Sequence, residues 1–264
     1  MKSLIQGFLG RIGYRLQRLQ PDFPPLDGCS FSVLDLALER LNSQRAGRVR
    51  FLQIGANDGI HQDPCYPWLC VHPWQGVLVE PMPALAAQLR NLHAHHSGIA
   101  IEQAVVADTP GTMTFYHLAA DVPLPPEASA ISSLESEFVT TAMRNFVAAG
   151  LRADGLRVAN FAVPALTIEQ LMERHHLDGL DFLQIDAEGY DARILASIDF
   201  KQIRPVVVAY EHANLSRAEL MHCRELLKAE GYHFGSWLGD TVAIQVNNLP
   251  AADLQRAVKV TEAA

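Results

Sequence analysis

One stretch of the chain is especially informative about its architecture: Phe51-Leu-Gln-Ile-Gly-Ala-Asn-Asp-Gly59. A short, mostly apolar run ends at a glycine and a polar turn, which is typical of a strand buried on both faces of a parallel sheet. In open α/β sheets a ligand binds outside the carboxyl ends of the strands, and Gly55 permits close approach because glycine has no Cβ. The pattern is not G-x-G-x-x-G, so it fits a dinucleotide pyrophosphate poorly.

Outward from this stretch, strand and helix signals alternate along the chain. Predicted helices begin at Pro83 and at three capping boxes, which pair Ser132 with Glu135, Thr167 with Gln170 and Ser216 with Glu219. Predicted strands cover 49–54, 76–80, 99–106, 111–118, 180–185 and 206–210, and 232–237 with 241–246 form a closing hairpin. We therefore expect an α/β, Rossmann-like fold, with a mostly parallel seven-stranded sheet, a C-terminal antiparallel hairpin and helices on both faces.

Residues 1–20 have the spacing of an amphipathic basic helix, with Arg11, Arg15 and Arg18 among its charges. Such a helix can lie on an anionic membrane surface, or it can pack on the domain or on a second subunit. A segment rich in proline and glycine follows it. We expect residues 1–25 to form this helix and a linker, and residues 26–264 to form one domain.

Composition narrows the classes of protein to which the chain can belong. The 264 residues are 49% hydrophobic, which argues against disorder over most of the length, and the net charge of −8 disfavours nucleic acid as a partner. Four cysteines without zinc-ligand spacing indicate reduced thiols in a cytoplasmic protein. No apolar run reaches the ~20 residues of a membrane helix.

Polar and charged side chains follow several of the predicted strands. Glu80 ends the second strand, where it can accept hydrogen bonds from both hydroxyls of a ribose. Asp186 and Glu188 follow the strand at 180–185, and Glu211 and His212 follow the strand at 206–210. We expect these groups to gather at one edge of the sheet, where such a cluster orients a ligand or transfers protons.

The chain resembles the FkbM-type methyltransferase family. The resemblance is carried by Phe51-Leu-Gln-Ile-Gly-Ala-Asn-Asp-Gly-Ile60, Leu78-Val-Glu-Pro-Met-Pro83, Ala104-Val-Val-Ala-Asp108, Leu166-Thr-Ile-Glu-Gln-Leu171 and Leu183-Gln-Ile-Asp-Ala-Glu-Gly-Tyr-Asp191. It implies a class I methyltransferase fold with S-adenosylmethionine as methyl donor. It also implies O-methylation of sugars, polyketides or other natural products. Gln184 departs from the family, which often has a lysine there, and this changes the charge balance near the site.

Together, the residues and the resemblance define an expected site. We expect the methyl donor to be bound by Gly55, Ala56, Asn57, Asp58, Glu80, Gln103, Ala104 and Asp186. Asp186, Glu188 and His212 are the expected catalytic residues, and Asp186 or His212 acts as the general base. A divalent cation such as Mg²⁺ is an alternative participant, because carboxylates are hard oxygen donors. The proline-rich segment 119–130 with its following helix is a candidate lid over a small-molecule or glycan acceptor.

Two other interpretations stay open. One is a nicotinamide-dependent oxidoreductase, although the chain has neither a G-x-G-x-x-G motif nor a distinct substrate domain. The other is a non-catalytic module whose N-terminal helix docks on a membrane or a partner, and such a module would not need polar groups clustered at the strand ends.

Overall fold

The computed structural model describes residues 32–125, 128, 130–237, 239–245 and 248. The expected helix over 1–20 lies outside these residues, as does the division between 25 and 26. The membrane, partner and domain predictions for this segment therefore stay predictions. No helix in the described part of the chain is long and apolar enough to cross a membrane.

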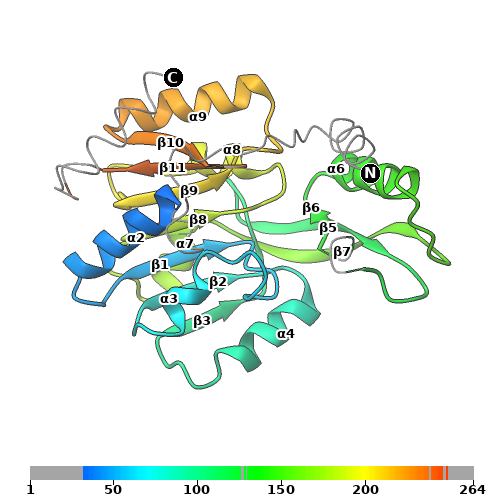
Figure 1. Ribbon diagram of the computed structural model, residues 1–264, viewed down its shortest axis with the longest axis horizontal. Helices are drawn as coiled ribbons and strands as arrows, with labels where there is room; N and C mark the ends of the chain where they lie inside the picture. Colours follow the sequence, from blue (N-terminus) through cyan, green and yellow to red (C-terminus); the bar gives the residue numbers. More distant parts are fainter. Residues whose placement is uncertain (1–31, 126–127, 129, 238, 246–247, 249–264) are drawn as a thin grey trace, which may run out of the picture.

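The main layer is a seven-stranded sheet in the order β10-β11-β9-β8-β1-β2-β3 (Figure 1). All neighbours pair in parallel except β10 with β11 and β11 with β9. The strands are β1 (Arg50–Ile54), β2 (Gln75–Val79), β3 (Ile99–Glu102), β8 (Phe182–Ile185), β9 (Val207–Glu211), β10 (His233–Trp237) and β11 (Asp240–Ile244). The predicted mostly parallel sheet and its antiparallel C-terminal hairpin are confirmed.

The strand order reverses direction at the centre of this sheet. β1 pairs with β2 on one side and with β8 on the other, and β8 carries the same four residues, Phe-Leu-Gln-Ile, in register with those of β1. The carboxyl ends of β1 and β8 therefore flank the switch point, where open α/β sheets bind their ligands.

Helices cover both faces of the sheet, as predicted. α2 (Val33–Gln44), α3 (Tyr66–Leu69) and α4 (Pro83–Leu92) contribute to one apolar core, and α7 (Ile168–Arg174), α8 (Asp191–Ser197) and α9 (Arg217–Ala229) contribute to the other. The capping boxes at Thr167 and Ser216 are present, and Pro83 opens α4. The two capping boxes succeeded because they satisfy backbone donors within their own helices, and Pro83 because it has a helical φ and no N–H to satisfy.

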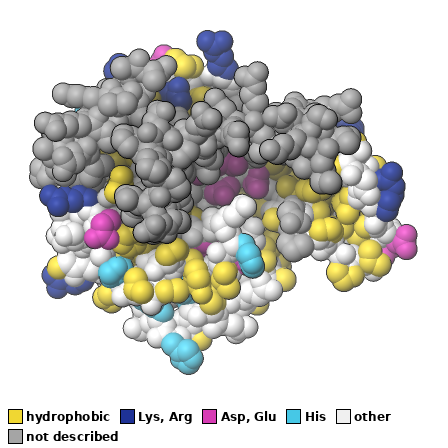
Figure 2. All heavy atoms as spheres, in the orientation of Figure 1, with side chains coloured by type: hydrophobic (Ala, Val, Ile, Leu, Met, Phe, Trp, Pro, Cys, Tyr) yellow, Lys and Arg dark blue, Asp and Glu magenta, His cyan; other side chains and the backbone are white. Residues whose placement is uncertain are grey.

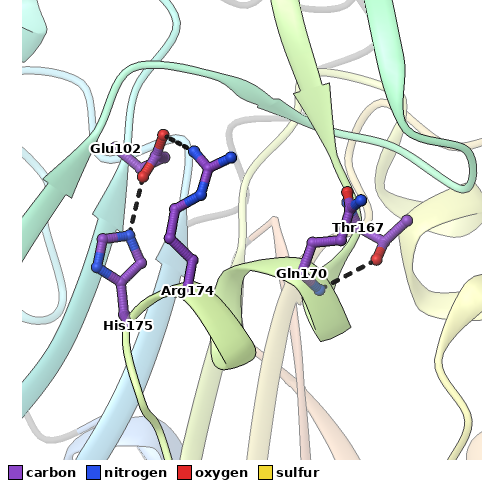
Figure 3. A network of polar contacts seen from close by, with 5 residues as sticks. All are labelled: Glu102, Thr167, Gln170, Arg174 and His175. Atoms are coloured by element: carbon purple, nitrogen blue, oxygen red, sulfur yellow. Dashed lines mark hydrogen bonds and ion pairs between the residues drawn. The ribbon is translucent and has the colours of Figure 1, made fainter.

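α7 is also tied to the end of β3. The Glu102 carboxylate accepts hydrogen bonds from Arg174 at 2.6 Å and from His175 at 2.8 Å (Figure 3). The same view shows Thr167 and Gln170 at the start of that helix. The ion pairs fix the carboxyl end of β3 beside the cleft described below.

A second sheet projects from the first as an arm, with the strand order β4-β7-β5-β6 (Figure 1). Its strands are β4 (Val105–Val106), β5 (Gly111–Ala119), β6 (Ser132–Ser133) and β7 (Arg157–Leu166), and α6 (Ser136–Ala148) packs on it. Leu118, Ala128 and Val139 form a small core of their own. The arm therefore adds a small core of its own, while Val105, Phe115 and Val163 of its strands pack into one core of the main sheet.

The arm corrects two expectations. The predicted strand 99–106 is divided between the sheets, because β3 pairs with β2 whereas Val105 and Val106 pair with β7. The prediction of a capping box at Ser132 is wrong. Ser132 belongs to β6, and α6 begins after Glu135 without a side-chain cap. The hydroxyl of Ser133, the other residue of β6, makes a tertiary contact by donating to the Glu188 carbonyl at 2.9 Å.

Candidate functional site

A cleft opens at the carboxyl ends of β1, β2 and β8. Two adjoining cavities make up this cleft, and they share the lining residues Gly55, Glu80, Ser132, Asp186 and Glu188. Figure 2 shows acidic side chains gathered in a hollow near the centre of one face. The cleft lies at the switch point of the sheet, where the sequence placed it.

One cavity is mainly apolar. Val79 and Ala104 line it from the main sheet and the loop after β3, while Phe115 and Leu134 line it from the arm. Its wall therefore combines residues from both sheets. Such a surface fits a flat, weakly polar ring, because apolar side chains can cover the ring without leaving strongly polar groups unpaired.

The other cavity is polar. Gln53 and Gln184 face it from paired positions on β1 and β8, and both side chains are at least 95% buried. Their Oε1 atoms have no hydrogen-bond partner within the residues that the structure describes. Buried acceptors without partners are costly, so this cavity favours a ligand that carries hydrogen-bond donors.

Gly55 brings the backbone of β1 close to the backbone after β8. Its φ is +78°, and a Cβ at this position would lie 1.8 Å from the Asp186 carbonyl oxygen. Only glycine fits such an approach without moving a strand. Asn57, two residues later, has a φ of +49°, so the turn keeps a left-handed conformation at a residue other than glycine.

Glu80 is the buried acid at the end of β2. Its side chain is 4% exposed, and its carboxylate accepts hydrogen bonds from the backbone N–H of Asn57 at 2.9 Å and of Met82 at 2.8 Å. Burial raises the pKa of Glu80 to about 7, although both hydrogen bonds oppose that rise. The two oxygens keep further lone pairs, which suits them to accept from a diol.

A group of acids lies at the ends of β8 and β9. Asp186 is exposed to the cleft, although many protein atoms lie around its carboxylate. Partial burial among these atoms, and secondly the charge of Glu188, raise the pKa of Asp186 well above its ordinary range. Burial, followed by repulsion from neighbouring acids, raises the pKa of Glu188 to about 8 and that of Glu211 to about 7. Asn214 donates to both glutamates.

Asp191 organises the loop that carries these acids. It is fully buried at the start of α8 and accepts from the backbone N–H of Ala187 at 3.3 Å and of Gly189 at 3.2 Å. Burial raises its pKa to about 6. Glu188 has a φ of +48°, a conformation that needs support from its surroundings. Asp191 and the Ser133 hydroxyl supply that support on two sides.

The structure brings together most of the expected site residues. Gly55, Ala56, Asn57, Glu80, Ala104, Asp186 and Glu188 all line the cleft. Three others do not line either cavity. Asp58 pairs with His61, Oδ2 to Nδ1 at 2.5 Å, while Gln103 lies just after β3. His212 lies 3.1 Å from the Thr241 hydroxyl through Nδ1, and burial lowers its pKa.

Several lining residues were not expected from the sequence. A signal existed for Gln53 and Gln184, because each is the one polar residue in its run of Phe-Leu-Gln-Ile. Phe115, Ser132 and Leu134 carried no such signal, because the arm brings them to the cleft. Among the described residues, no group of histidine, cysteine or acidic side chains is arranged to hold a metal ion.

Comparison with known proteins gives one family. The family model described as Methyltransferase FkbM domain matches residues 53–234. The chain is also similar to a solved structure of Methyltransferase FkbM from Methylobacillus flagellatus KT, with 12% identity and a TM-score of 0.47 over 75% of this chain and 44% of that one. A second similar structure is the CMeT domain of the citrinin polyketide synthase, with 11% identity and a TM-score of 0.40 over 81% and 52%. The chain thus spans about half the length of these structures, and no curated protein matches it.

Proposed function

The chain belongs to the family of FkbM methyltransferases, and from this premise we propose that it uses S-adenosyl-L-methionine to methylate a hydroxyl group. The proposed acceptor is a sugar, a glycan or another natural-product small molecule. The observation that carries the proposal is Glu80, a buried carboxylate held beside Gly55 at the mouth of the apolar cavity.

The residues of the cleft fit this cofactor. Glu80 offers two oxygens to the ribose hydroxyls, and Gly55 lets the ligand lie against the backbone. The apolar wall at Ala104 suits the adenine ring. The unpartnered oxygens of Gln53 and Gln184 suit the ammonium group at the other end of the molecule.

When bound, the cofactor supplies a methyl group on a positively charged sulfur, open to in-line attack by an oxygen. The walls of the cleft would position the acceptor hydroxyl against the bound cofactor, and such positioning lowers the entropy cost of the reaction. Asp186 is the candidate general base, because it lines both cavities and its raised pKa makes its carboxylate a stronger proton acceptor than an ordinary aspartate. His212 stays a second candidate, although it does not line the cleft.

The first experiment is isothermal titration of the protein with S-adenosylhomocysteine, with and without Mg²⁺. Glu80→Gln removes one ribose acceptor, and Glu225→Gln on the exposed face of α9 is the matched control. We expect micromolar binding to the wild type and the control, and at least a roughly tenfold loss in Glu80→Gln. Mg²⁺ dependence would introduce a metal into the mechanism.

Binding would justify a screen of sugars and natural products with methyl-labelled cofactor, in which label on an ether oxygen identifies O-methylation. Absence of binding in both conditions would refute the proposed cofactor. A nicotinamide-dependent enzyme or a docking module would then be the leading interpretation, and a change in NADH fluorescence on adding protein separates those two.

A further inference from the structure

Gln53 and Gln184 form a pair of buried amides in the wall of the polar cavity. They are register partners on β1 and β8, and only 3% and 5% of their surfaces are exposed. The Oε1 atom of each has no hydrogen-bond partner within the residues that the structure describes. Two such acceptors, held away from bulk water in the wall of one cavity, point to a ligand that brings hydrogen-bond donors.

Asp63 lines the same cavity and contacts one of these amides. Its Oδ1 accepts hydrogen bonds from the backbone N–H of Cys65 at 2.7 Å and of Tyr66 at 3.1 Å, at the start of α3. Burial raises the pKa of Asp63, and a hydrogen bond from the Gln53 side chain opposes that rise. Only the Nε2 end of a glutamine amide can donate, so this contact turns Nε2 toward Asp63 and leaves Oε1 as the end without a partner.

The charged side chains around the pair are mostly acids. Glu80, Asp186 and Glu188 line the cavity together with Asp63, and its described lining contains no lysine or arginine. A protonated amine has three donors and a positive charge, so it can satisfy both amide oxygens in this surrounding. A ligand group that carries only acceptors would leave these oxygens unpaired.

We propose that Asp63 is a positioning residue, which fixes the Gln53 amide so that Gln53 and Gln184 together recognise the amine at the amino-acid end of the cofactor. The pair thereby selects adenosyl ligands that carry this amine against ligands that lack it. The proposal rests on the proposed function, because it concerns the same cofactor in the same cleft.

Two ligands that differ only by the amine test this selection. One is S-adenosylhomocysteine, and the other is its deaminated analogue, in which a hydrogen atom replaces the amine. In isothermal titration of the full chain we expect at least roughly tenfold tighter binding of S-adenosylhomocysteine, because hydrogen bonds to a charged group change affinity by about that factor. Equal affinities in the wild type would overturn the selection and leave the cofactor supported. If neither ligand binds, the proposed function fails, and this inference fails with it.

Gln184→Met tests the pair, because methionine has a similar length and lacks the amide acceptor. The variant should bind S-adenosylhomocysteine more weakly and the deaminated analogue as the wild type does, so the preference for the amine falls. Gln44→Met, at an exposed position at the end of α2, is the matched control and should keep the full preference. An equal loss of affinity for both ligands in Gln184→Met would show that Gln184 only shapes the cleft, and would refute its role in recognition.

Asp63→Asn tests the positioning role. The new side chain keeps an oxygen for the two backbone donors of α3 and places an N–H where the Asp63 carboxylate met Gln53. Gln53 should then turn Oε1 toward this N–H and Nε2 toward the cavity, so the preference for the amine should fall. Asp154→Asn, at an exposed acid in the loop before β7, is the matched control and should keep the preference.

A double-variant cycle separates positioning from the charge of Asp63. Gln53→Met removes the oxygen through which Asp63 acts, so Asp63→Asn should lower the preference no further in that background. Additive losses from the two changes would show that Asp63 acts by its charge alone, and would refute its positioning role.

Discussion

Glu80 should make the protein less stable as the pH rises, and Glu80→Gln should remove that loss. The ordinary pKa of 4.5 is raised by burial to about 7 in the folded protein, so the folded state binds more protons than the unfolded chain between these values. The stabilising contribution of the protonated acid is fully present below the unfolded pKa and is lost as pH rises through the folded one.

The size of the effect follows from the two pKa values. Between about pH 5 and about pH 9, the wild type should lose about 2.5 kcal/mol of unfolding free energy at this one residue. Glu80→Gln also has a second effect, which lowers the stability of the variant. Glutamine has a single oxygen, so the backbone N–H of Asn57 or of Met82 loses its acceptor, at about 1–3 kcal/mol.

These two effects separate because only the first depends on pH. Glu80→Gln should therefore be less stable than the wild type at about pH 5, and about as stable at about pH 9. The change in the stability difference between these pH values should be roughly 2–3 kcal/mol. The other acids of the cluster titrate in both proteins and cancel, since none of them is among the causes of the Glu80 shift.

Urea unfolding followed by tryptophan fluorescence, at several pH values across this range, measures the effect. Glu225→Gln is the matched control, and its stability difference from the wild type should not change with pH, because the Glu225 side chain is exposed and Glu80 is retained. A stability difference for Glu80→Gln that stays constant within about 0.5 kcal/mol across the range would show that the acid is not desolvated, and the argument from burial would fail.

Three further predictions test other parts of the structure. Gly55→Ala should lower the free energy of unfolding by roughly 2–3 kcal/mol, because the new Cβ overlaps the Asp186 carbonyl. The same change should abolish binding of S-adenosylhomocysteine in calorimetry, and unaltered binding would contradict the close approach of the two backbones. Thr167→Ala removes the capping box with Gln170, so thermal unfolding should show a loss of about 1 kcal/mol with unchanged ligand affinity. His212→Ala should lower turnover more than cofactor affinity, measured with labelled cofactor once an acceptor is found; lost binding with normal turnover at saturation would exclude His212 as the base.

Local patterns in the sequence determined the main sheet. Two identical runs, Phe51 to Ile54 and 182–185, predict buried strands. A short, almost wholly apolar run is typical of a strand whose sheet is covered on both faces. The capping boxes at Thr167 and Ser216 predict helix starts, because their hydrogen bonds close within four residues. The placement of Gly55, Glu80 and Asp186 at one edge followed from the rule for parallel strands.

Tertiary structure alone decided the arm and the partners of the acids. β7 lies about forty residues beyond β5 in the chain, and Pro164 interrupts its alternation of apolar and polar residues. No local pattern therefore predicts that β5 and β7 pair as an antiparallel ribbon. Ser133 illustrates the same limit, because its hydroxyl donates to the carbonyl of Glu188, 55 residues away, and no local pattern predicts that partner. The link from Asn214 to Glu188 and Glu211 likewise spans separate elements. A sequence records which groups can form hydrogen bonds, whereas the choice among distant partners depends on how the packed elements meet.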